Sequence, residues 1–115
     1  MKTLTPIALV LALLPVSPAY AAPVYLTCPM QPNGRPSPID VMLDEAAGTA
    51  TVYVRENGRM HQMRAAFTQT EVTFRNDMVS YKLSRVSLTL TRSVPSINRN
   101  ETVVCSLAPP VKRAF

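Results

Sequence analysis

The 115-residue sequence has no tryptophan, one histidine, two cysteines and three glycines, and only 17% of its residues are charged. An enzyme of this size needs a nucleophile or a tuned acid–base pair. The sequence offers no recognisable nucleophile motif and no glycine-rich phosphate loop. Asp44 and Glu45 are adjacent carboxylates, but neighbours in an extended chain point to opposite faces. We therefore expect a protein that is not an enzyme and that carries no cofactor.

Long hydrophobic runs are also missing. The longest, Leu4 to Val16, has thirteen residues and contains two prolines, whereas a membrane-spanning helix needs roughly 17 to 25 residues. Lys2 precedes this run, and the small-residue pattern Ala19-Tyr20-Ala21 follows it. Together these features predict a signal peptide over residues 1–21, and a periplasmic or secreted mature chain without a transmembrane anchor.

Export favours a disulfide between the two cysteines, because disulfides form in oxidising compartments. Cys28 and Cys105 are expected to form one disulfide near the two ends of a single β domain, residues 22–108. The remaining residues, 109–115, contain two prolines and two cations and are predicted to be a flexible tail.

The charge balance is basic, with twelve Lys plus Arg against seven Asp plus Glu. Removal of Lys2 with the signal peptide leaves eleven cations, of which nine are arginine. Such an excess favours an anionic envelope component or a protein as partner. Export argues against nucleic acid, and no basic patch with interleaved aromatics supports it.

The mature chain alternates apolar and polar residues in short segments separated by turn residues, which is typical of antiparallel strands. We predict an all-β fold, a small antiparallel β-sandwich or barrel of about seven or eight strands closed by one disulfide. The closing strand should carry Val103, Cys105 and Leu107 on its inward side. Residues 29–38, with four prolines, and residues 93–101 are expected to be surface loops.

Two pairs of turn residues predict hairpins with two-residue loops. Asn57-Gly58 favours a type I′ turn, because both central positions need a positive φ. Its register would place Val54 opposite His61, and Val52 opposite Met63. By the same logic, a turn at Asn76-Asp77 would place Phe74 opposite Val79, and Val72 opposite Tyr81.

The first of these hairpins carries the candidate binding residues. Arg55, Arg59, Arg64 and Tyr53 could bind an anionic sugar or phosphate group through bidentate contacts. Solvated charges that deter strand-to-strand aggregation explain the same residues.

A copper site is a second hypothesis, since His61 and Met63 share a strand face and soft sulfur with imidazole nitrogen suits copper. Met42 and Met78 could approach them. Core packing explains the methionines equally, and we predict no metal.

Three segments carry a resemblance: residues 41–50, residues 67–74 and residues 81–85. They resemble a group of small exported bacterial β proteins with an early and a late cysteine and no established activity. The chain is more distantly similar to periplasmic lysozyme inhibitors, although it lacks their Ser-Gly-containing loop and the aromatic-Lys-Gly segment that follows it. The resemblance implies the fold and the export, and it carries over no functional residue.

These observations predict a non-enzymatic binding module of the bacterial cell envelope that presents loops 29–38 and 93–101 to a partner. The alternatives are an inhibitor of a cell-wall hydrolase and a periplasmic copper-binding protein. The ligand and the oligomeric state stay open.

Overall fold

The computed structural model describes residues 22–109. The predicted signal peptide and all of the predicted tail except Pro109 lie outside these residues. The described part contains two short 3-10 turns, η1 (Pro32–Gly34) and η2 (Pro95–Ile97). Its nine strands are β1 (Val24–Cys28), β2 (Ile39–Asp44), β3 (Thr49–Val54), β4 (Arg59–Phe67), β5 (Glu71–Arg75), β6 (Ser80–Ser84), β7 (Thr89–Val94), β8 (Arg99–Val104) and β9 (Ser106–Ala108). The all-β prediction is confirmed.

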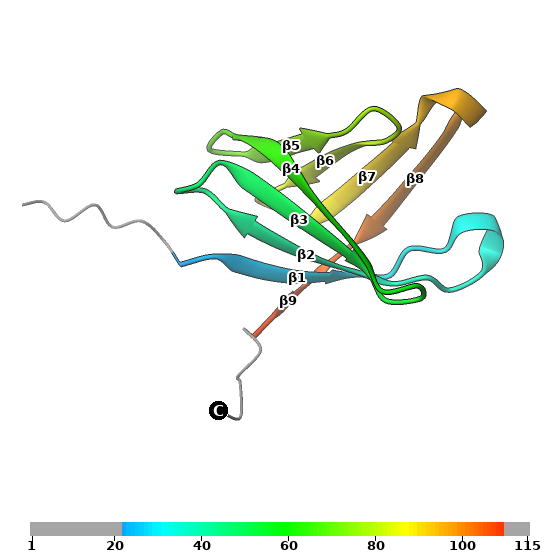
Figure 1. Cartoon of the computed structure of the whole chain (residues 1–115). Helices are drawn as coiled ribbons and strands as arrows, with labels where there is room; N and C mark the ends of the chain where they lie inside the picture. The colour runs from blue at the N-terminus through cyan, green and yellow to red at the C-terminus, as the bar shows by residue number, and fades with distance from the viewer. Residues whose placement is uncertain (1–21, 110–115) are drawn as a thin grey trace, which may run out of the picture.

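The strands form one antiparallel sheet in the order β8-β7-β6-β5-β4-β3-β2-β1-β9. Each strand from β1 to β8 pairs with its neighbours in sequence, whereas β9 pairs with β1. Figure 1 shows β8 and β9 running one after the other, from the layer of β5–β8 to the edge of the layer of β1–β4. The sheet is therefore a nearly closed barrel, in which the last part of the chain links the two ends of the strand order.

The strand count of nine, rather than seven or eight, comes from a break in the predicted closing strand. The amide of Cys105 donates a hydrogen bond of 2.9 Å to the carbonyl of Leu88, one position beyond the last β7–β8 pair. β8 therefore ends on β7, and β9 begins a new pairing with β1. The expected alternation fails after this break, because Leu107 is 65% exposed.

The opposite corner of the barrel is made by β4, the longest strand. Its first residues, Arg59–Arg64, pair with β3, and its last residues, Ala65–Phe67, pair with β5. One continuous strand thus serves both layers in Figure 1. Strands that pass from one layer to the next in this way are a common means of turning the corner of a β-sandwich or barrel.

The predicted disulfide is present, with an S–S distance of 2.10 Å between Cys28 and Cys105. It joins the end of β1 to the residue between β8 and β9. Both cysteines are buried, so the covalent link lies at the point where the barrel closes.

The core consists of alternate residues that point inward from both layers. Phe74 and Tyr81 stack across β5 and β6 with ring centroids 4.9 Å apart. The buried hydrophobic side chains are those of Leu26, Cys28, Met30, Ile39, Val41, Leu43, Ala50, Val52, Met63, Val72, Phe74, Tyr81, Leu83, Leu90 and Cys105. Every strand from β1 to β7 contributes at least one of them.

The first hairpin has a longer loop than predicted. Val54 pairs with Arg59, so four residues, 55–58, form the turn, and Val52 lies opposite His61 instead of Met63. Of these four residues only Gly58 has a positive φ, at 71°, and its amide donates to the carbonyl of Val54. The predicted type I′ turn, with positive φ at two successive residues, is therefore wrong.

The second hairpin deviates by the same amount. Arg75 pairs with Ser80, and Phe74 lies opposite Tyr81 instead of Val79. The side-chain oxygen of Asn76 accepts hydrogen bonds from the amides of Met78 and Val79 at 2.8 and 2.9 Å, which fixes a four-residue turn. Because both registers shift by two residues, every side chain keeps its predicted face.

The loop of residues 29–38 is on the surface, but it is anchored. The Met30 side chain is buried. The Gln31 amide donates to the carboxylate of Glu101 on β8, and the Arg99 guanidinium donates to the side-chain oxygen of Asn33. These contacts hold the loop against β8.

Candidate functional site

Tyr53 and Arg55 lie at the end of β3 on the outer side of the barrel, but Arg55 is already paired. Its guanidinium donates two hydrogen bonds, of 2.9 and 2.7 Å, to the two carboxylate oxygens of Asp40. These hydrogen bonds, opposed in part by burial, lower the pKa of Asp40 below its ordinary value of 3.8. The positive charge of Arg55 is therefore largely balanced at this position.

The outer surface around this pair is a groove of about 550 Å³ across the first layer. It is lined mainly by apolar and aromatic side chains, including Tyr25, Met42, Tyr53 and Met60. Arg55 lies in it as half of an ion pair. The groove therefore offers a ligand mainly apolar contact area, and its arginine is already paired with a carboxylate.

The structure does not gather the four predicted binding residues at one place. Arg59 begins β4 opposite Val54, on the alternate positions that face inward further along the strand. Arg64 lies five residues further on the outer face, opposite Thr49. Tyr53 and Arg55 thus share one groove, and Arg64 belongs to another.

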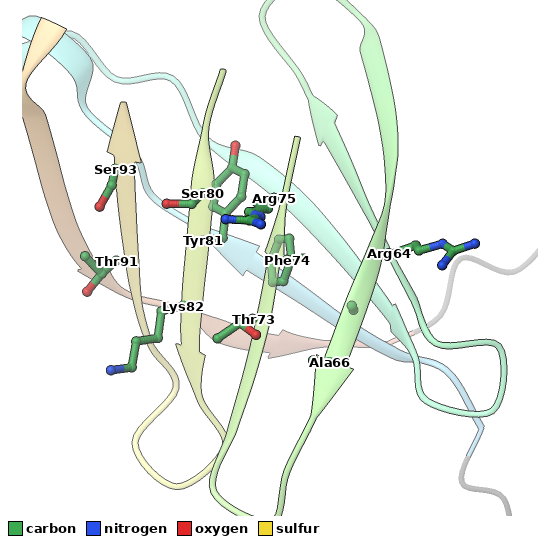
Figure 2. Close-up of a pocket in the computed structure, with 11 residues that line it drawn as sticks. Arg64, Ala66, Thr73, Phe74, Arg75, Ser80, Tyr81, Lys82, Thr91 and Ser93 are labelled. Atoms are coloured by element: carbon green, nitrogen blue, oxygen red, sulfur yellow. The ribbon is translucent and has the colours of Figure 1, made fainter. Parts of the chain in front are cut away.

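That second groove, of about 670 Å³, crosses the outer face of β4, β5, β6 and β7. Its cations are Arg64, Arg75 and Lys82. Figure 2 shows Arg64 beyond β4 on one side and Lys82 on the other, with Arg75 between them. Hydroxyl groups from adjacent strands lie in the same groove, on Thr73, Ser80, Thr91 and Ser93.

The arginines of this cationic groove are not balanced by acids. Lys82 is paired with Glu71 at 3.7 Å. Arg64 and Arg75 have no carboxylate within 4 Å among residues 22–109. Neither side chain is buried, so both can reorient toward an incoming anion.

Sequence reasoning found Arg64 but missed Arg75 and Lys82. The strand alternation could have indicated these two residues, because it places Thr73 with Arg75, and Ser80 with Lys82, on outward positions. Their proximity to Arg64 depends on β4 continuing from the first layer to β5. That continuation is not visible in the local pattern.

The two residues of the copper hypothesis occupy the same face of β4 but differ in environment. Met63 is buried in the core, and His61 is exposed. Met42 is on the outer side of β2, and Met78 lies in the turn after β5, 72% exposed. No group of three or more His, Cys, Asp or Glu side chains that could hold a metal occurs in the described part of the chain.

A polar cluster occupies the inner side of β6–β8. Arg92 lies 4.0 Å from Glu101, and both side chains are mostly buried. Burial raises the pKa of the nearby Tyr81, an effect that the charge of Arg92 partly opposes. Because Glu101 also accepts a hydrogen bond from the Gln31 amide, this cluster fastens the loop of residues 29–38 to the barrel.

Comparison with known proteins assigns no family. No family model matches the chain, and no curated protein or solved structure is significantly similar to it. Within residues 22–109 there is no helix of sufficient length and apolarity to cross a membrane.

Proposed function

We propose that this chain is an exported, non-enzymatic binding module of the bacterial cell envelope, and that the cationic groove on β4–β7 binds an anionic polysaccharide. The observation that carries the proposal is the combination of three cations with a row of hydroxyl groups across four adjacent strands. Guanidinium groups bind carboxylate, sulfate or phosphate substituents in bidentate fashion. The hydroxyl groups can exchange hydrogen bonds with sugar hydroxyls.

The charge distribution supports this groove over the predicted hairpin face. Arg55 is paired with Asp40, and Arg59 lines neither of the two grooves. Arg64 and Arg75 keep their charge unbalanced at the groove, within the described residues. An anion should therefore bind more tightly in this groove than at Arg55, where it would compete with the carboxylate of Asp40.

Dextran sulfate serves as the test probe, with uncharged dextran as the reference. We expect the protein to bind dextran sulfate with an affinity that falls steeply as salt rises, and to bind dextran at least ten-fold more weakly. The variant Arg64→Gln/Arg75→Gln should lose at least ten-fold in affinity at low salt.

A matched control removes the same net charge elsewhere. Arg35→Gln/Arg59→Gln also lowers the charge by two, but both residues lie outside the groove. It should reduce affinity by less than about three-fold, since only long-range attraction is lost. If the two double variants weaken binding equally, net charge rather than the groove explains the binding and the proposal is wrong. Equal binding to anionic lipid vesicles and to dextran sulfate would also contradict it.

A further inference from the structure

An apolar cavity opens between the two layers of the barrel, at the end opposite the loop of residues 29–38. It has a volume of about 210 Å³ and is lined from β1, β2, β4, β5, β6, β9 and the turns after β2 and β6. Its inner wall includes Leu26, Val72 and Leu83, all buried core residues. At its mouth Val24 and Leu107 are 39% and 65% exposed.

One residue of the cavity wall is held in an unfavourable backbone conformation. Leu88 has a φ of 62°, in the left-handed region that bulky side chains rarely adopt. Its amide donates to the carbonyl of Ser84, and its own carbonyl accepts from the Cys105 amide. This conformation places a leucine side chain, rather than the hydrogen of a glycine, at the wall of the cavity. Strain of this kind concentrates at binding sites.

The mouth carries one balanced ion pair. The Arg85 guanidinium donates to Glu45 at 3.0 Å and to the carbonyl of Thr68 at 2.6 Å, and it lies 5.8 Å from the ring centroid of Phe67. All other side chains among residues 22–109 that line the cavity are apolar. A carboxylate head at the mouth would be repelled by the carboxylate of Glu45, and an ammonium head would be repelled by the guanidinium of Arg85. An uncharged hydroxyl can donate to the first and accept from the second.

We propose that this cavity binds a single aliphatic chain that ends in an uncharged hydroxyl head. A cavity of 150 Å³ lined by leucine, isoleucine and phenylalanine holds benzene, so a volume of about 210 Å³ corresponds to a chain of about eight carbons. This site is distinct from the cationic groove, because it faces the barrel interior and shares no lining residue with that groove.

The test uses the oxidised protein with 1-octanol, octanoate and octylamine as probes, followed by calorimetry and by the NMR shifts of leucine methyl groups. We expect 1-octanol to bind with a Kd on the order of 0.1 mM and to shift the methyl signals of Leu26 and Leu83. Octanoate and octylamine should bind at least five-fold more weakly. The absence of octanol binding up to its solubility, or shifts confined to the outer face, would overturn the proposal.

Charge substitution at the mouth tests the role of the head group. Glu45→Gln leaves Arg85 without its partner, so octanoate should become the tightest ligand of the three. Arg85→Gln should have the opposite effect and favour octylamine. An unchanged order of the three ligands in both variants would show that the pair does not contact the head.

Chain length tests the role of Leu88. Leu88→Gly removes four carbons from the wall, so the alcohol that binds best should lengthen by roughly two to four carbons. Asn98→Gly is the matched control, because Asn98 also has a positive φ, of 51°, but lies in the loop between β7 and β8. It should leave the preferred length unchanged. An optimum that stays at eight carbons in Leu88→Gly would contradict the site.

Discussion

At the scale of single residues, the Asp40–Arg55 pair shows how a predicted binding residue acquires a structural partner. Arg55 stands out in the sequence as one of several basic residues in a hairpin. In the fold its guanidinium lies across two strands against Asp40, at 2.7 Å. The register between β2 and β3, which places Asp40 opposite Tyr53, brings the two charges together. The pattern of charges in the sequence alone does not predict this ion pair.

The pair predicts a pH dependence of stability. A carboxyl whose pKa is lower in the folded than in the unfolded state stabilises the fold above its unfolded pKa, and this contribution disappears as the pH falls through the folded pKa. For Asp40, whose ordinary value is 3.8, the loss occurs in acid below about pH 4. In Asp40→Asn the difference in unfolding free energy between pH 7 and pH 2 should be smaller than in the wild type.

Urea denaturation at the two pH values measures this difference. The effect should be modest, because the Asp40 and Arg55 side chains are 38% and 50% exposed and water screens the pair. Asp77→Asn is the control, since Asp77 lies in an exposed turn and makes no ion pair within the described part of the chain. If both variants flatten the pH dependence equally, the Arg55 contact is not its source.

Leu88 predicts a second effect at the residue scale. A left-handed conformation destabilises a non-glycine residue by about 1–2 kcal/mol. The partial burial of the leucine side chain stabilises the fold by a similar amount. Leu88→Gly should therefore change the free energy of unfolding by less than about 1 kcal/mol. Leu90→Ala, two residues away in the fully buried core, should cost about 2–5 kcal/mol. Urea unfolding of both variants tests this contrast, and a large loss in Leu88→Gly would mean that its side chain is essential to the core.

At the scale of elements, the strands and their buried faces could be predicted, but the turns could not. Val52, Val72 and Phe74 occupy alternate apolar positions in the two predicted hairpins, and all three are buried. The two hairpin loops were each predicted two residues too short. The side-chain oxygen of Asn76 accepts from two amides beyond it, which favours a longer turn that a dipeptide pattern does not contain. A shift by two residues keeps the faces, so the predicted faces of these two hairpins remained correct although their registers were wrong.

The Asn76 turn gives a prediction for its hairpin. Asn76→Ala removes the acceptor of the Met78 and Val79 amides and should destabilise the protein by about 1–2 kcal/mol. Asn57→Ala is the comparison, because among residues 22–109 the Asn57 oxygen accepts only from the Arg59 amide. It should cost about half as much. Urea midpoints measure both losses, and equal losses would show that the side-chain bonds do not set the Asn76 turn.

At the scale of the whole molecule, the sequence could predict the disulfide near the two ends of the domain, but it left a sandwich and a barrel both open and did not predict the groove. The predicted signal peptide implied an oxidising compartment, and the inward positions expected for Cys28 and Cys105 then favoured their pairing. The cationic groove depends on β4 serving both layers, which brings Arg64 beside the β5–β6 hairpin. This is a tertiary property, because no local segment contains both Arg64 and Lys82. The same holds for the cavity, whose wall comes from six strands and two turns.

The last prediction concerns the disulfide, because it fastens the short strand that links the two ends of the strand order. The bond joins cysteines 77 positions apart in the sequence, and chain-entropy arguments assign such a closure about 4 kcal/mol of stabilisation. Cys28→Ser/Cys105→Ser should lower the free energy of unfolding by about this amount. β9 has three residues and, in the described part of the chain, pairs only with β1, so its amides should also lose their protection from hydrogen exchange. The amides of β5 and β6, which lie between paired strands on both sides, should keep theirs under native conditions. Urea unfolding measures the global loss, and hydrogen exchange measured by NMR measures the local one. A uniform loss of protection would mean that the bond stabilises the fold as a whole without a special role at β9. Unchanged protection of the β9 amides would mean that pairing with β1 suffices to hold the barrel closed.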